Sequence, residues 1–139
     1  MATTTSTSAI TAQGKILGTR NGLVTFAPAN TTYELHLVAP AYGGAVNTLI
    51  NGIIRVTARK AYTVPSGGNF ISPIYGTPRT IQGRVRAIDG NSLVVQAGAP
   101  IHVTMPTEAS AVELANGSIT VGSLINVVAM PGATFELIA

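Results

Sequence analysis

Two histidines are the residues best suited to chemistry in this chain, and aliphatic residues flank each of them. Leu35-His36-Leu37 and Ile101-His102-Val103 share the same alternation of apolar and polar positions. Two matched imidazoles could hold a metal ion or relay a proton. Their wide separation in sequence matches no metal-ligand motif. We keep His36 and His102 as metal candidates, against the simpler interpretation that each lies on the polar face of a strand.

The acidic side chains are too scattered to suggest acid–base catalysis. Glu34 falls in an expected strand and Asp89 in an expected turn, and no two acidic residues share a short motif. No serine lies in the context of a nucleophile elbow. Ser66-Gly67-Gly68 lacks the lysine and the helix that follow the glycines of a phosphate-binding loop. The sequence therefore predicts a non-enzymatic protein without a cofactor.

Arginines and tyrosines offer a second kind of site, one for single-stranded nucleic acid or glycan. Arg84 and Arg86 alternate onto one face of an expected strand. Single-strand binding combines such cations with exposed rings on which bases stack. The competing interpretation is that these residues are solvated cations and tyrosines at the rim of an interface. The ligand-binding candidates are Arg55, Arg59, Lys60, Arg84, Arg86, Tyr42, Tyr62 and Tyr75.

The sequence segments that must position these side chains occur in two similar copies along the chain. Gln13-Gly14-Lys15-Ile16 matches Gln82-Gly83-Arg84-Val85, and 35–40 matches 101–106. Such self-similarity predicts one β unit present in two copies. Three further matches pair Leu23-Val24 with Leu93-Val94, Ile54 to Ala58 with Ile125 to Ala129, and Pro65 to Phe70 with Pro131 to Phe135.

Alternating apolar residues, interrupted by turn signals, predict short strands in both copies. Asn21-Gly22 and Asp89-Gly90-Asn91 are turn signals, Gly14 indicates a bulge or a bend, and 40–51 is a connection without a full helix. A helix is expected at 107–116, because Thr107 can cap its start and a glycine follows its end. The expected strands are 10–17, 23–26, 33–38, 53–58, 69–75, 80–88, 92–97, 101–105, 118–120, 124–129 and 134–138.

Each unit has three strands, a connection and two more strands, which resembles the order of an OB-like or related Greek-key barrel. The expected fold class is all-β, with two tandem homologous small β-barrels and at most one short helix. An SH3-like barrel or a fused sandwich fits the pattern nearly as well. The expected domains are an N-terminal arm at 1–12, a first barrel at 13–75, a linker at 76–79 and a second barrel at 80–139.

The composition is apolar and weakly charged. Charged residues make up only 9% of the 139 residues, against about 25% in an ordinary soluble domain. The sequence contains no run of about 18 apolar residues, so no membrane-spanning helix is expected. Partners are the most direct means of covering such an apolar surface. No signal peptide is visible, which fits a cytoplasmic protein or part of an assembled particle.

Charge and the N-terminal arm point to assembly. Residues 1–70 hold five cations and one acid, net +4, whereas residues 71–139 hold three cations and four acids, net −1. Opposite charge can orient head-to-tail association, and the β-prone arm could add a strand to a neighbour. The sequence therefore predicts a self-assembling structural protein, such as a particle shell, capsid-decoration or filament subunit. Its partners would be copies of itself or a larger shell or scaffold protein. The alternative is a tandem-barrel binding module for single-stranded nucleic acid or glycan.

Overall fold

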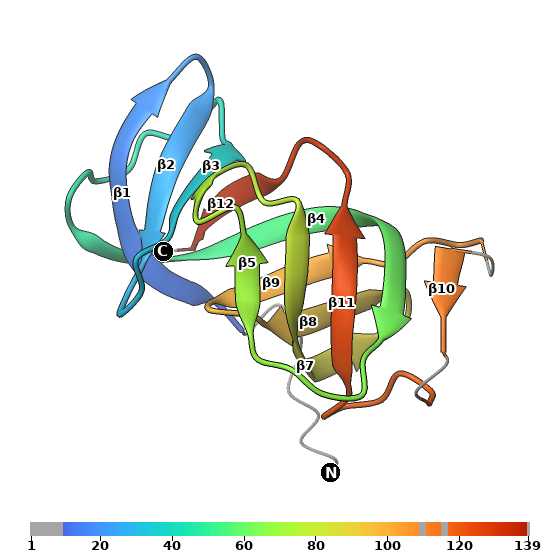
Figure 1. The fold of residues 1–139 in the computed structure, drawn as a ribbon. Coiled ribbons are helices and arrows are strands. Elements are labelled where there is room, and N and C mark those ends of the chain that lie inside the picture. Colours follow the sequence, from blue (N-terminus) through green and yellow to red (C-terminus); the bar gives the residue numbers. More distant parts are fainter. Residues whose placement is uncertain (1–9, 109–110, 115–116, 139) are drawn as a thin grey trace, which may run out of the picture.

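The computed structural model describes residues 10–108, 111–114 and 117–138 (Figure 1). Every strand in this part of the chain belongs to one mixed sheet, so the expected all-β class is confirmed. The strands are β1 (Ala12–Arg20), β2 (Leu23–Pro28), β3 (Glu34–Val38), β4 (Leu49–Thr63), β5 (Phe70–Ser72), β6 (Tyr75–Gly76), β7 (Thr80–Asp89), β8 (Ser92–Gln96), β9 (Pro100–Thr104), β10 (Val112–Glu113), β11 (Leu124–Ala129) and β12 (Thr134–Ile138).

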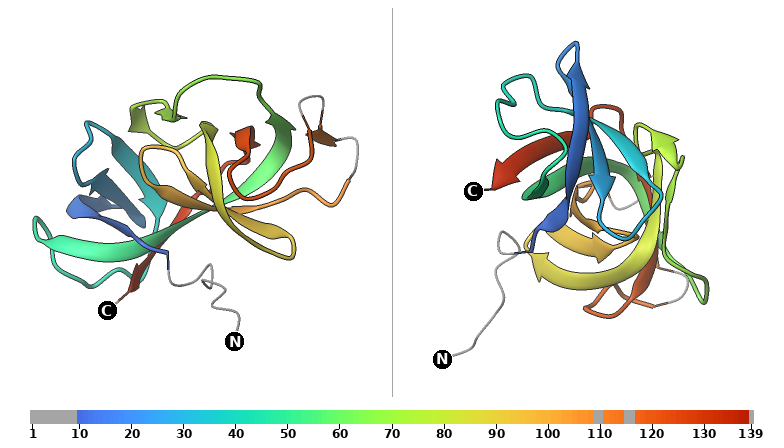
Figure 2. Two further views of the ribbon diagram at one scale, coloured as in Figure 1. Left: turned by 90° about the horizontal axis from the view of Figure 1, so that it is seen from below. Right: turned by 90° about the vertical axis from the view of Figure 1, so that its left-hand side faces the viewer.

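The long strand β4 runs through two groups of paired strands and joins them (Figure 2). Residues 49–52 pair with β1, and residues 51–55 pair with β12. Farther along, residues 54–57 pair with β9, and residues 58–63 pair with β11. The pairings β1-β2-β3-β12-β4 return to β1, and the pairings β7-β8-β9-β4-β11 return to β7. We call these the first and the second circuit, and β4 belongs to both.

Strand pairings cross the expected division of the chain at several places, since β9, β10 and β11 of the expected second barrel pair with β4 of the first. β12 lies antiparallel to β4 and meets β3 where Thr134 faces Val38. β5 lies antiparallel to β7, from the Phe70–Gln82 pair onwards. The domain boundary at 76–79 stays a prediction, and hydrogen-bonded strands join its two sides.

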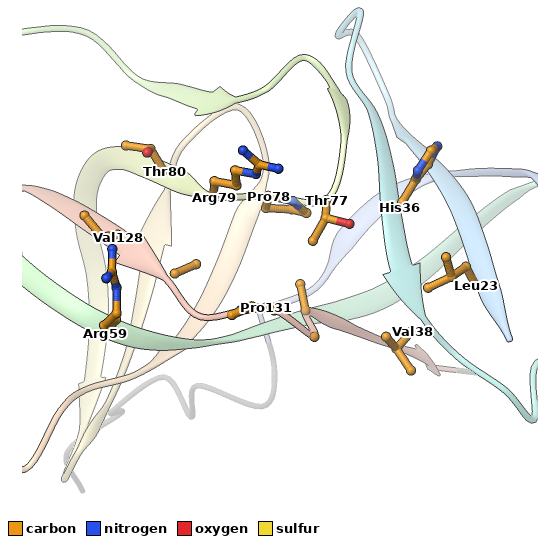
Figure 3. A pocket seen from close by; sticks show the side chains of 13 residues that line it. Leu23, His36, Val38, Arg59, Thr77, Pro78, Arg79, Thr80, Val128 and Pro131 are labelled. Carbon is orange, nitrogen blue, oxygen red and sulfur yellow. The ribbon is translucent and has the colours of Figure 1, made fainter.

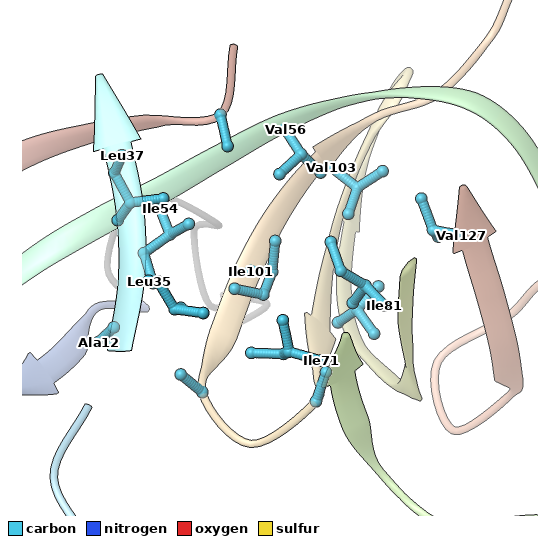
Figure 4. Packing of buried hydrophobic residues seen from close by; sticks show 14 of the residues in the cluster. Ala12, Leu35, Leu37, Ile54, Val56, Ile71, Ile81, Ile101, Val103 and Val127 are labelled. Carbon is cyan, nitrogen blue, oxygen red and sulfur yellow. The ribbon is translucent and has the colours of Figure 1, made fainter. Parts of the chain in front are cut away.

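One hydrophobic core runs through both circuits (Figure 4). Leu35 and Leu37 of β3 are fully buried, and Ile101 and Val103 of β9 are buried in the same alternation. Ile54 of the shared strand is fully buried as well. Complete burial of one such side chain stabilises a fold by about 1.5–3 kcal/mol. The predicted alternation is thus confirmed, and it leaves each histidine on the outer face of its strand.

Two glycines allow neighbouring backbones to approach β1 and β7 closely. A Cβ atom at Gly14 would lie 2.3 Å from a carbonyl oxygen of β2, and one at Gly83 would lie 2.1 Å from a carbonyl oxygen of β8. The sequence predicts a bulge or a bend at Gly14, and the register shift between β1 and β2 lies farther along, between Ile16 and Gly18. At Gly14 itself the structure shows a close approach of the β2 backbone.

A buried polar pair distinguishes the second circuit. Asn126 Nδ2 donates a hydrogen bond to Gln82 Oε1 at 3.0 Å, and Gln82 Nε2 donates to the Gly68 carbonyl at 2.9 Å. Gln82 thereby ties the loop after β4 to the sheet. Gln13 and Asn51 face each other at the corresponding place in the first circuit, and both are exposed.

The expected helix at 107–116 is wrong over its described residues. Val112 and Glu113 form β10, which lies parallel to Ala61 and Tyr62 of β4. The edge of β4 offers backbone donors and acceptors there, and pairing with them outweighs local helix propensity. In the part of the chain that the structure describes, no helix is long and apolar enough to cross a membrane.

Three expected strands also differ from the structure. The segment at 118–120 is not a strand, because the Thr120 N–H donates to Ser123 Oγ in a turn. The strand expected at 53–58 begins earlier, at Leu49, and continues to Thr63. The last residues of the connection expected at 40–51 therefore belong to this strand. The strand expected at 69–75 is divided into β5 and β6.

Candidate functional site

A cleft of about 790 Å³ lies between β2 and β3 on one side and the segments that lead into β7 and β12 on the other. We call it the main cleft. Leucine, valine, proline and alanine side chains make up much of its lining. Figure 3 shows His36 on one side, Arg59 on the opposite side and Arg79 between them. No described acidic residue lines this cleft, so its ionisable groups are two arginines and an imidazole.

Arg59 reaches the main cleft from a bulge in β4. Ala58 lies opposite Ala129, and Lys60 lies opposite Val128, so Arg59 is an extra residue without a partner of its own. Arg59 and Lys60 are both exposed, although neighbours in a regular strand point to opposite faces. A bulge redirects side chains in this way.

Arg79 reaches the same cleft from the segment before β7. Its backbone N–H donates to the Ser72 carbonyl at 2.9 Å, and its carbonyl accepts from the Ala129 N–H at 2.8 Å. Pro78, which precedes it, is buried. These contacts fix the backbone of Arg79, while its side chain stays exposed to solvent.

A smaller hollow of about 310 Å³ adjoins the main cleft, because Leu23 and His36 line both. Arg20 and Tyr75 also line this hollow. The Tyr75 ring is 64% exposed and meets the His36 ring edge to face, with 4.8 Å between the ring centroids. We call the main cleft and this hollow together the trough. It contains three arginines and two rings, and no described acidic residue lines it.

The side chains of the trough arginines have no polar partner among the described residues. Arg20, Arg59 and Arg79 make no side-chain hydrogen bond or ion pair with any described residue. The other predicted cations are already bound by the chain itself, and none of them lines the trough. These are Arg55 with Glu136, Lys60 with Glu113 at 3.4 Å, Arg84 with the Gly122 carbonyl at 2.9 Å and Arg86 with Gln96 Oε1 at 2.9 Å.

The three predicted tyrosines are separated from one another. Tyr75 lines the trough. Tyr42 packs edge-on against Phe135, with 6.2 Å between centroids, and burial raises the pKa of its phenol. Its hydroxyl donates to the Ala45 carbonyl, so Tyr42 holds its own loop. Tyr62 lies on β4 between β10 and β11.

His36 and His102 have different surroundings, and no hydrogen bond or ring contact between described residues joins them. His102 Nε2 lies 2.7 Å from the Ile10 carbonyl and must carry a proton, because a carbonyl oxygen only accepts. Ile10 is buried and packs with Ala87 and Val94. No group of three or more His, Cys, Asp or Glu side chains in the described ranges could hold a metal ion. A metal site at His36 and His102 stays a prediction.

Known proteins offer no guide to the use of the trough. No family model, curated protein or solved structure matches this chain. The function is therefore inferred from the geometry alone.

Sequence reasoning missed two residues of the trough. The sequence assigns Arg20 to a turn and Arg79 to the linker, and neither is a predicted site residue. For Arg79 a usable signal is present, since no acidic residue occurs between Glu34 and Asp89 and Arg79 lies in that span. Arg20 lies outside the span, and no such signal marks it.

Proposed function

We propose that this chain is a non-enzymatic structural subunit that assembles with copies of itself, as in a particle shell, a capsid decoration or a filament. The observation that carries the proposal is the exposure of large apolar side chains in a chain with few charges. Contact with another protein surface removes such groups from water, and this favours association.

Three exposed apolar residues lie on segments whose backbones meet where β1 pairs with the start of β4, and we call Leu17, Val46 and Leu49 the apolar face. Leu49 lies opposite Lys15 in the β1–β4 pairing, and Lys15 and Leu17 of β1 are both exposed. The residue after Val46 donates its N–H to the Ile16 carbonyl, which holds this segment against β1. Leu49 is 51% exposed. The apolar face is the proposed contact between copies.

The opposite charge of the two halves supports assembly less than the sequence suggested. Arg55 and Lys60 of the first half pair within the chain with Glu136 and Glu113 of the second half. All four side chains are about half exposed. Such pairs contribute little to stability, but they neutralise charge that would otherwise face a neighbour. The proposed assembly therefore depends on apolar contact rather than on head-to-tail attraction.

We also propose that the two circuits are copies of one OB-like barrel. The β1–β2 and β7–β8 hairpins carry a register shift at matching points, which supports the duplication. In this alignment Leu49-Ile50-Asn51 corresponds to Leu124-Ile125-Asn126, since these trios face β1 and β7 respectively. The sequence comparison instead matched 54–58 with 125–129. The fifth strand of the first barrel would be β12, and that of the second would be the middle of β4.

The mass of the purified protein in solution tests the proposed assembly. Light scattering at low and high salt should give a discrete species well above the 14.2 kDa chain. Val46→Glu combined with Leu49→Glu should reduce it to the mass of one chain, because the contact would bury two charges. Val121→Glu is the matched control, since Val121 is an exposed apolar residue of the second half and should be neutral.

Deleting residues 1–9 tests the arm separately, and the deletion should stop there because Ile10 and Ala12 are buried.

A mass of 14.2 kDa under all conditions would contradict self-assembly. An assembly that survives the double glutamate change would show that the apolar face is not the contact.

A further inference from the structure

We propose that the trough binds single-stranded nucleic acid, with its arginines on the phosphates and its rings and apolar floor against the bases. This inference concerns a different surface from the apolar face and does not depend on self-assembly. It follows from three features of the trough: its unpaired charge, the distribution of its cations over the main cleft and the hollow, and the kind of surface that accompanies them.

The positive charge of the trough is not neutralised by ion pairs with described residues. Among the described residues, Arg20, Arg59 and Arg79 form no ion pair, whereas Arg55 and Lys60 do. Concave surfaces lined by charges of one sign concentrate the electrostatic field and attract ligands of opposite charge. With no described carboxylate in the lining, the trough is suited to an anion.

The positions of the arginines favour a chain of phosphates over a single one. Arg20 lines only the smaller hollow, whereas Arg59 and Arg79 line only the main cleft. His36 lines both. A single phosphate is held by donors that converge on one point. Cations distributed along a groove instead follow a polyanionic backbone.

The surface between the arginines is suited to unpaired bases. The exposed Tyr75 ring, supported by His36, offers a stacking platform, because every base has a flat face that can stack on an aromatic ring. Leu23, Val38 and Pro131 offer apolar contact in the adjoining main cleft. A duplex hides its base faces in its own stack and would leave these groups without contact. The trough therefore favours a single strand.

Fluorescence anisotropy with a labelled oligothymidylate of about 12 nucleotides tests the proposal. Arg59→Gln with Arg79→Gln should weaken binding about tenfold or more and reduce the slope of log K against log salt by about 1.4, since two phosphate contacts are lost. Tyr75→Ala should weaken binding about tenfold without changing that slope. Arg84→Gln with Arg86→Gln is the matched control and should retain both affinity and slope, because these arginines lie outside the trough.

Several results would overturn the assignment. They are the absence of binding at low salt, an equal loss in the Arg84 and Arg86 control, and displacement of the oligonucleotide by inorganic phosphate or a mononucleotide at similar concentration. Equal affinity for a duplex, or for the sulfated glycan heparin, would also reject a single-strand site. The thermal unfolding and the scattering mass of the Arg59 and Arg79 variant should match those of the unmodified protein. Any weakened binding would then report the trough and not the fold or the assembly.

Discussion

β3 and β9 carry a histidine at matching positions, yet only one of these histidines faces an open hollow. His36 lines the trough beside the exposed ring of Tyr75. His102 is bonded to the Ile10 carbonyl, and Ile10 packs over the second circuit against Ala87 and Val94. The comparison teaches that a strand pattern decides where a side chain lies. Segments outside the pattern decide whether that position is open to a ligand.

The backbone constraint common to both circuits gives the largest expected effect. Gly14→Ala and Gly83→Ala should each destabilise the fold by about 3 kcal/mol, because the new methyl group would overlap a backbone carbonyl of the neighbouring strand. Gly18→Ala is the matched control, since no heavy atom lies within 4 Å of its Cβ position. Urea denaturation measures all three. If only one of the two glycines were sensitive, the circuits would not share this constraint.

Mutation of the buried amide pair should lower stability more than mutation of its counterpart in the first circuit. Gln82→Ala should cost about 1–3 kcal/mol, because it leaves Asn126 Nδ2 and the Gly68 carbonyl without their partner. Gln13→Ala removes the exposed counterpart and should change stability by less than about 0.5 kcal/mol. The same denaturation experiment compares them. Similar losses from both changes would show that burial of the pair does not set the difference.

The two histidines give the smallest expected effect on stability. His102→Ala should cost about 1 kcal/mol and increase hydrogen exchange at Thr11 and Ala12, because it releases the Ile10 carbonyl. His36→Ala should leave stability and exchange unchanged but weaken oligonucleotide binding. The reverse assignment, with exchange altered only by His36→Ala, would contradict the comparison.

Local features of the fold could be predicted from the sequence because their causes are local. The alternation in β3 identifies its buried leucines, and Asn21-Gly22 takes the positive φ angles, 51° and 79°, that a tight hairpin needs. The bounds of β11 and β12 match the expected 124–129 and 134–138. Each of these depends on residues only a few positions apart.

The pairing of distant strands could not be predicted in this way. A Cβ at Gly52 would lie 2.1 Å from the Phe135 ring, so the need for a glycine in β4 comes from a residue of β12, far along the chain. The trough presents the same difficulty, since its arginines come from β1, β4 and the segment before β7. Arg59 stood out because it precedes another cation. Arg20 and Arg79 become candidate site residues only when folding brings those segments together.

The position of β12 has a consequence for how the protein is made. The first circuit contains β1, β2, β3 and β4, but it is completed by β12, which leaves the ribosome after every strand of the second circuit. β3 and β4 therefore stay incompletely paired while the rest of the chain is synthesised. Such late, long-range pairing slows folding and leaves strand edges exposed in the meantime. In the cell, the nascent chain would depend most on chaperones during this interval.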